Sequence, residues 1–271
     1  MLTEVIAAAH EAGRVIQGVR EAGFEVLSKG DAGPVTEADH RADALLRERL
    51  LGLRPAGWLS EETADSPERL SRNVLWVVDP LDGTKEFIKG LPEYTVAIAL
   101  VERGEPVLSV VHNPVTGDTF AAERGGGATL NDVAIRVAEG RTCLASRSEM
   151  KRGEFEPFTD WDLTPIGSIE YKLALVAAGR AAMTLSRGPK HEWDVCAGAL
   201  LVTEAGGLAT DVFGDPLRYN QSFPKTKGVL AGAPEAYARA LKLVRRTGAS
   251  DRMAEMDGSR GPGAGSRPPT S

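Results

Sequence analysis

The chain has 271 residues, of which 42% are hydrophobic, and its formal net charge is −6 at pH 7. This length and composition suffice for one large domain or two closely packed halves. The acidic balance argues against a nucleic acid polymer or an anionic membrane as the main partner, because both attract basic surfaces. The two cysteines, Cys143 and Cys196, form no C-x-x-C motif, so neither a disulfide framework nor a thiolate zinc site is indicated.

The N-terminal segment has an apolar stripe with helical spacing. The stripe predicts an amphipathic helix rather than a secretory signal, and it consists of Leu2, Val5, Ile6, Ala9 and Ile16. No segment reaches the roughly 18 consecutive apolar residues that a membrane span requires. We therefore expect a cytoplasmic protein without a membrane span.

A turn rich in glycine and proline leads into a second predicted helix over residues 37–53, with Thr36 as its expected N-cap. The run NVLWVVD at 73–79 then predicts a buried strand, followed by a loop and a short helical turn. Residues 94–127 predict three strands at hairpin spacing.

After about residue 137, short strands over 142–146 and 182–185 alternate with helices over 170–178 and 195–204. This alternation favours an α/β arrangement. We expect an N-terminal half over residues 1–138 and a C-terminal half over 139–247. Residues 248–271 are rich in glycine, proline and serine and lack periodicity, which predicts a disordered tail.

The motif DPLDGT at 79–84 places Asp79 and Asp82 at the end of the predicted buried strand. Two carboxylates buried there need a cation, because an unpaired buried charge is strongly unfavourable. Hard oxygen ligands suit Mg²⁺, and the backbone N–H groups of Gly83 and Thr84 would suit a phosphate. For this motif alone, the alternative that Asp-Pro and Asp-Gly simply mark turns stays open.

Three further acidic stretches each have an ordinary explanation. Glu61 and Glu62 could be solvated, Asp39 could complete a capping box with Thr36, and Asp194 could cap a helix. Their order along the chain is more specific: an aspartate, a Glu-Glu pair, DPLDGT, and then W-D-x-x-A-G. This order resembles the magnesium-dependent, lithium-sensitive phosphatases of the inositol monophosphatase family, from about residue 1 to about residue 245.

The resemblance implies an α/β fold, a layered α+β sandwich of alternating helix and sheet, with the site between the two halves. It also suggests a homodimer. By the family motif, a first Mg²⁺ would be bound by Glu61, Asp79 and the backbone carbonyl of Leu81. A second would be bound by Asp79, Asp82 and Asp194, and a weaker third ion would share Glu61.

The resemblance further implies that Asp39 and Thr84 activate the attacking water, with Thr84 passing its proton toward Asp39. Glu62 is a less certain acid that would orient the metal-binding residues. The amides of Gly83 and Thr84 would hold the phosphate oxygens.

The substrate is suggested by finer likenesses. DPLDGTKEFI and SRSE, at 79–88 and 146–149, look most like the 3′(2′),5′-bisphosphate nucleotidases, whereas inositol monophosphatases typically have Thr-Asn where Lys85-Glu86 stands. The inositol branch also commonly carries an acid seven residues before the W-D aspartate. That position here is Arg187, with Lys190 nearby. Two cations suit a second phosphate, although solvated surface charges remain the alternative.

Ser168 and Lys172 match a Ser and a Lys of related nucleotidases and would face the nucleotide, unless Lys172 caps a surface helix. The set expected to bind substrate is therefore Glu61, Gly83, Thr84, Ser168, Lys172, Arg187, Lys190 and Asp194.

The expected activity is Mg²⁺-dependent hydrolysis of 3′-phosphoadenosine 5′-phosphate to AMP and phosphate, a reaction of sulfur metabolism. An inositol or sugar monophosphatase, acting on inositol 1-phosphate, fructose 1,6-bisphosphate or histidinol phosphate, is the second hypothesis. A non-catalytic module that binds metal and phosphate is the third. The sequence has no P-loop spacing, no close histidine pair and no G-x-S-x-G motif, so other common hydrolase chemistries lack support.

Overall fold

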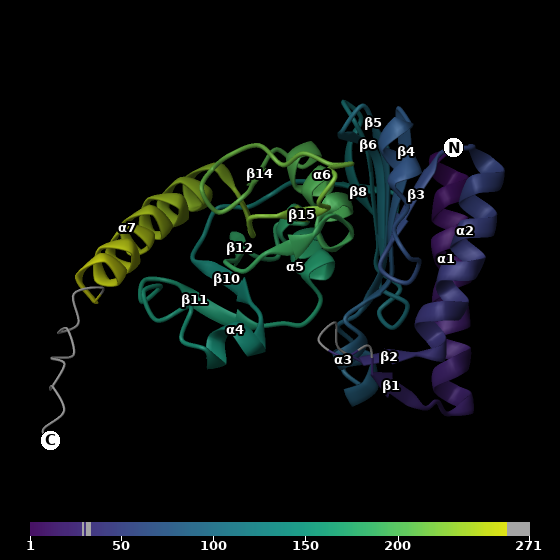
Figure 1. The fold of residues 1–271 in the computed structure, drawn as a ribbon, viewed down its shortest axis with the longest axis horizontal. Helices are drawn as coiled ribbons and strands as arrows, with labels where there is room; N and C mark the ends of the chain where they lie inside the picture. The colour runs from purple at the N-terminus through teal and green to yellow at the C-terminus, as the bar shows by residue number, and fades with distance from the viewer. Residues whose placement is uncertain (29, 31–33, 259–271) are drawn as a thin grey trace, which may run out of the picture.

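The computed structural model describes residues 1–28, 30 and 34–258. Helices and sheets alternate in layers, beginning on the right of Figure 1 with the helix pair α1 (Leu2–Ala22) and α2 (Glu37–Leu53). Helices α5 (Ile169–Ala177) and α6 (Cys196–Glu204) lie between two sheets, and a long helix covers the outer sheet on the left. The predicted sandwich of alternating helix and sheet layers is confirmed.

The first layer is held together by small apolar residues. Ala8 and Ala12 of α1 are buried, and their size lets α2 approach closely. Thr36 caps α2 in a complete capping box, as predicted. A short antiparallel ribbon of β1 (Val26–Ser28) and β2 (Pro34–Thr36) precedes α2.

A seven-stranded sheet forms the second layer. Its first two strands are parallel and all later neighbours are antiparallel, in the order of the sequence. The strands are β3 (Gly57–Ser60), β4 (Val74–Asp82), β5 (Thr95–Glu102), β6 (Glu105–His112), β7 (Thr119–Glu123), β8 (Gly127–Leu130) and β9 (Val133–Ile135).

Strand β4 explains why the sequence here is apolar without alternation. Trp76 and Val78 pack toward α1 and α2, whereas Leu75 and Val77 pack toward α5 and α6. A strand buried on both faces has no polar side, so the predicted buried strand is confirmed. It continues to Asp82, past its predicted end at residue 79, through an irregularity in the pairing with β5.

The fourth layer is a five-stranded sheet in the order β11-β10-β12-β16-β14, in which β10 is parallel to both of its neighbours. The strands are β10 (Thr142–Ala145), β11 (Asp162–Pro165), β12 (Met183–Ser186), β14 (Leu208–Thr210) and β16 (Val229–Gly232). A separate two-stranded ribbon pairs β13 (Lys190–His191) with β15 (Lys225–Thr226).

Helix α7 (Pro234–Gly258) packs Ala236, Ala240 and Val244 on the outer face of this sheet. Short helical segments complete the chain: η2 (Pro67–Ser71), α3 (Thr84–Lys89), α4 (Arg147–Lys151) and η3 (Glu192–Asp194).

The three strands predicted over residues 94–127 are confirmed as β5, β6 and β7, and they are followed by two short strands that were not predicted, β8 and β9. Helix α7 extends through Gly258, and residues 259–271 lie outside the described residues. The disordered tail expected over residues 248–271 stays a prediction.

The two expected halves share one core. A single hydrophobic cluster includes Leu75 and Val77 from the first half and Leu144 and Leu201 from the second. The boundary at residue 138 stays a prediction. No helix within the described ranges is long and apolar enough to span a membrane.

Candidate active site

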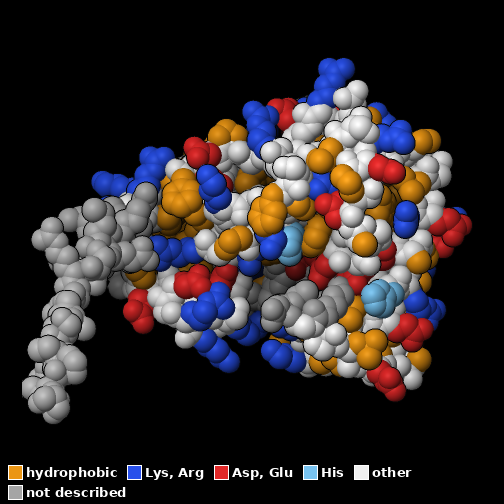
Figure 2. Space-filling view, viewed as in Figure 1, with side chains coloured by type: hydrophobic (Ala, Val, Ile, Leu, Met, Phe, Trp, Pro, Cys, Tyr) orange, Lys and Arg blue, Asp and Glu red, His pale blue; other side chains and the backbone are white. Residues whose placement is uncertain are grey.

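A cavity of about 280 Å³ opens where β4 ends and the N-terminal ends of α3 and α5 meet η3. Acidic side chains gather near the middle of the face shown in Figure 2. The predicted site residues that line the cavity are Glu61, Asp79, Leu81, Asp82, Gly83, Thr84, Ser168, Lys190 and Asp194. The tertiary structure therefore brings together residues from both halves of the chain.

The turn after β4 has a tightly constrained backbone. The amide of Leu81 donates to Asp79 Oδ1 at 3.0 Å, which orients that carboxylate. Gly83 has φ +102°, and a Cβ there would lie 2.7 Å from the Glu93 carbonyl oxygen. Only glycine fits this position without strain, because other residues rarely adopt such φ values.

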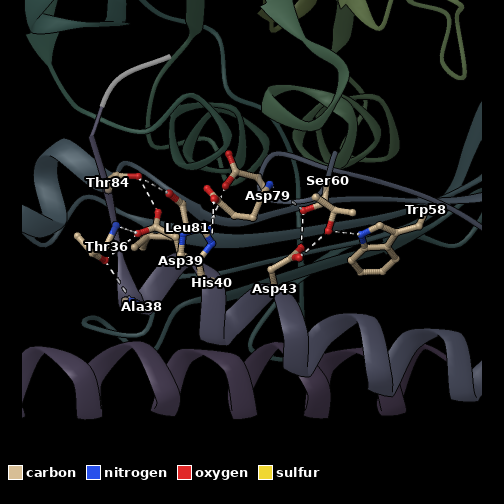
Figure 3. Close-up of polar contacts among 12 residues, drawn as sticks. Thr36, Ala38, Asp39, His40, Asp43, Trp58, Ser60, Asp79, Leu81 and Thr84 are labelled. Carbon is tan, nitrogen blue, oxygen red and sulfur yellow. Dashed lines mark hydrogen bonds and ion pairs between the residues drawn. The ribbon is translucent and has the colours of Figure 1, made fainter. Parts of the chain in front are cut away.

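Asp39 and Thr84, predicted as the catalytic pair, are in direct contact (Figure 3). The Thr84 hydroxyl donates to Asp39 Oδ1 at 3.0 Å. The other carboxylate oxygen accepts from the backbone N–H and the hydroxyl of Thr36, at 2.8 and 2.7 Å. Asp39 is buried and does not line the cavity, so it contacts the site through Thr84.

Asp43, one turn further along α2, holds the loop that carries Glu61 (Figure 3). It accepts hydrogen bonds from Ser60 at 2.5 Å and from Thr63 at 2.7 Å, the residues that flank the Glu-Glu pair. Sequence reasoning missed this role. The sequence spacing could have indicated it, because Asp39 and Asp43 are spaced i, i+4 on a predicted helix and therefore share a face.

The clustered carboxylates disfavour each other's charge. The pKa of Asp79 is raised well above its usual range, first by burial and then by Glu61, Asp82 and Asp194. Burial and the nearby Asp82 raise the pKa of Asp194 to about 7, although Lys190 opposes the shift. Carboxylates that repel one another in a cavity are the arrangement that a bound cation stabilises.

Asp82 is anchored by the beginning of α5. Its Oδ2 accepts from the Ser168 hydroxyl and from the Glu170 backbone N–H, both at 2.6 Å. Ser168 lines the cavity, but its hydroxyl is directed at a predicted metal ligand. Its expected contact with a nucleotide stays a prediction.

Glu170, which the sequence analysis overlooked, links α5 to α6. Its side chain is fully buried, and its carboxylate accepts from the amides of Ala197 and Gly198 at 3.1 and 2.5 Å. Burial, followed by the charge of Asp82, raises the pKa of Glu170 well above its usual range. Through its backbone and its carboxylate, Glu170 connects Asp82 to the helix that directly follows Asp194.

The three predicted cationic residues have different environments. Lys172 is fully buried and donates to Ser146 Oγ at 2.5 Å, so the alternative that it caps a surface helix is wrong. Lys190 lines the cavity, with its Nζ 3.8 Å from Glu149 Oε1. Arg187 does not line the cavity, and its Nη2 donates to Thr247 of α7 at 3.2 Å.

We predict that Glu170→Ala weakens binding of Mn²⁺, used as a spectroscopic substitute for Mg²⁺, by about tenfold. Loss of the carboxylate should let α6 and Asp194 shift relative to Asp82. The matched control is Asp211→Ala, because Asp211 is also buried and accepts from two backbone amides, those of Phe213 and Asp215. Calorimetric titration should show weaker binding in the Glu170 variant alone. Equal losses in both variants would refute this positioning role.

A pH dependence follows from Asp194. Its folded-state pKa of about 7 exceeds the ordinary 3.8, so the metal-free folded protein binds more protons than the unfolded chain between these values. The free energy of unfolding should therefore fall as pH rises through this window, by an amount on the order of 4 kcal/mol. Urea denaturation in EDTA should show a smaller fall in the free energy of unfolding with pH for Asp194→Asn than for the wild type. Asp162→Asn, an exposed control, should behave like the wild type. The same pH dependence in Asp194→Asn and the wild type would contradict the expectation.

The chain is similar to known proteins along most of its length. Residues 1–249 match the inositol monophosphatase family. An inositol-1-monophosphatase of Rhizobium meliloti (strain 1021) is 35% identical over 237 residues, which are 82% of this chain and 86% of that protein. A 3′(2′),5′-bisphosphate nucleotidase CysQ of Aggregatibacter actinomycetemcomitans is 34% identical over 239 residues, 82% of this chain and 88% of that protein. The crystal structure of the extragenic suppressor protein suhB from Bartonella henselae has a TM-score of 0.78 at 30% identity, over 89% of this chain and 97% of that one. The chain belongs to the inositol monophosphatase family of phosphatases.

Proposed function

We propose that this protein is a Mg²⁺-dependent phosphomonoesterase that hydrolyses 3′-phosphoadenosine 5′-phosphate to AMP and phosphate. The observation that carries the choice of substrate is the position of Lys190, which lines the same cavity as the carboxylates. A cation at this place suits a substrate that carries a second anionic group besides the phosphate to be removed. From the family likeness we also infer a homodimer that works in the cytoplasm.

The donor set fits magnesium in its chemistry. The side chains of Glu61, Asp79, Asp82 and Asp194 offer only hard carboxylate oxygens, and the Leu81 carbonyl adds another. In the described part of the chain, no three His, Cys, Asp or Glu side chains form a ready-made metal group, so these carboxylates must turn to bind an ion. Bound Mg²⁺ would neutralise their repulsion, lower the pKa of water and stabilise the leaving oxygen. We propose two or three ions.

The chain's own residues would then handle the proton. The hydroxyl proton of Thr84 is directed at Asp39, so its oxygen can accept a proton from the attacking water while Asp39 receives the original one. The bonds from Thr36 hold Asp39 in place for this transfer. We propose that the amides of Gly83 and Thr84, at the start of α3, bind the phosphate oxygens.

The second anionic group would lie toward Lys190 and Lys172. Lys172 is too deeply buried to meet solvent, but its ammonium group holds Ser146, which lines the cavity. We infer that Lys190 contacts the second phosphate directly and that Ser146, oriented by Lys172, donates a hydrogen bond to it. Because Arg187 does not line the cavity, we assign it no contact with the substrate.

An inositol or sugar monophosphatase is the second candidate. Glu149 is buried beside Lys190 and accepts from Ser186, so it offsets part of the positive charge available to a second phosphate. The inositol-1-monophosphatase of Rhizobium meliloti is as similar to this chain as the CysQ nucleotidase. Both candidates use the same metal chemistry and differ only in what surrounds the leaving group.

We predict that Thr84→Val lowers kcat by two to three orders of magnitude, the usual contribution of a positioned proton acceptor. Thr84→Ser should keep most of the activity, because it retains the hydroxyl. Thr203→Val is the control, since the Thr203 hydroxyl donates to backbone carbonyls of α6 and does not line the cavity. Phosphate release with saturating Mg²⁺ measures the effect. Near-normal turnover in the Thr84→Val variant would rule out the proposed proton transfer.

The substrate class is tested with Lys190→Gln and Arg187→Gln, which remove the same charge from neighbouring positions. We expect the Lys190 variant to lose about tenfold or more in kcat/KM for 3′-phosphoadenosine 5′-phosphate relative to inositol 1-phosphate. The Arg187 variant should leave that ratio unchanged. If the wild type prefers a sugar or polyol phosphate, or if Lys190→Gln affects both substrates equally, the nucleotide assignment fails while the metal chemistry stands.

A further inference from the structure

A second cavity, of about 390 Å³, lies along helix α7. Its lining includes four cationic side chains, Arg141, Arg239, Lys242 and Arg246, and one acid, Asp160. We call this site the α7 cavity. Lysine and arginine side chains gather over the α7 side of the molecule in Figure 2, although the whole chain carries a net charge of −6.

The α7 cavity is separate from the catalytic cavity. The two share no lining residue. Helix α7 packs on the outer face of the five-stranded sheet, whereas α5 and α6 cover its inner face (Figure 1). A ligand in the α7 cavity would therefore leave the catalytic residues uncovered.

The cations are held together rather than spread apart. One face of α7 carries Arg239, Lys242 and Arg246, because these residues are spaced i, i+3 and i+7. Like charges at this spacing destabilise a helix. Arg239 is fixed over the Trp161 ring, with its guanidinium carbon 4.6 Å from the ring centroid, and it donates to the Gly140 carbonyl. Arg141 approaches from the start of β10, with its Nη2 3.9 Å from Asp160. An anion bound among them would relieve this repulsion.

The remaining lining indicates what kind of anion fits. Pro157, Trp161 and Leu243 give the cavity an apolar side. Its volume lies within the range of sites for small molecules. Guanidinium groups match phosphate geometry through paired hydrogen bonds. A long nucleic acid is disfavoured, because the chain as a whole repels polyanions.

We propose that the α7 cavity binds a small organic polyphosphate, a nucleoside diphosphate or a compound of similar charge and size. Its phosphates would lie among Arg141, Arg239 and Lys242, and its apolar body would pack against Pro157 and Leu243. This site does not depend on the function proposed for the catalytic cavity.

The test is calorimetric titration of the full-length protein with ADP in EDTA, at about 20 and about 200 mM NaCl. Lys242→Gln should weaken binding by about tenfold, as expected for loss of one phosphate contact. Lys151→Gln, an exposed lysine of α4 outside both cavities, controls for charge, and Lys190→Gln controls for ADP in the catalytic cavity. Neither control should change the affinity, and higher salt should weaken binding.

Four results would overturn the proposal. The first three are no binding of ADP by the wild type, unchanged ADP affinity in Lys242→Gln, and loss of ADP binding in Lys190→Gln. The fourth is tighter binding of a single-stranded RNA of about 20 nucleotides than of ADP, if Lys242→Gln also weakens the binding of that RNA. Titration with inorganic pyrophosphate tests whether the apolar side of the cavity contributes to affinity, and pyrophosphate should bind more weakly than ADP. Equal affinity for the two ligands would overturn the proposed contact between the apolar side and the organic part of the ligand. Thermal unfolding of each variant checks that it remains folded.

Discussion

The structure around the catalytic cavity depends on the mutual repulsion of carboxylates held in one place. Burial raises the pKa of Asp79, Asp82 and Asp194, and the neighbouring acids raise the pKa of Asp79 and Asp194 further. Such a cluster lowers the stability of the folded protein unless a cation binds there. The surrounding helices and loops serve to hold these acids where that cation and a phosphate can meet.

Two helices do most of this positioning. Helix α2 carries Asp39, which accepts a hydrogen bond from Thr84, and Asp43, which accepts hydrogen bonds from the loop of Glu61. One rigid helix therefore positions two parts of the cavity wall. Helix α5 holds Asp82 through its first turn, and Glu170 then ties α5 to α6. Rigid helices place side chains more accurately than loops can.

The two halves are also joined at a distance from the cavity. Arg69 is buried and donates to the Asn220 side chain and to the Gln221 carbonyl. The amides of the same two residues donate to Glu192, which lies two positions before Asp194. The segment that carries Asp194 is therefore fixed to the first half by polar contacts as well as by the shared core. Relative movement of the halves would disturb the acid cluster directly.

The sequence by itself determined the helices α1, α2, α5 and α6, the doubly buried strand β4 and the order of acidic motifs, because apolar periodicity and short motifs are local properties. It also paired Asp39 with Thr84, through the family resemblance. Only the tertiary structure decided that Lys172 is buried and that Arg187 contacts α7 rather than the cavity. It also revealed Glu170, whose hydrogen bonds join residues almost 30 positions apart. Such contacts depend on how α5, α6 and α7 pack on the sheets, and no local pattern encodes that packing.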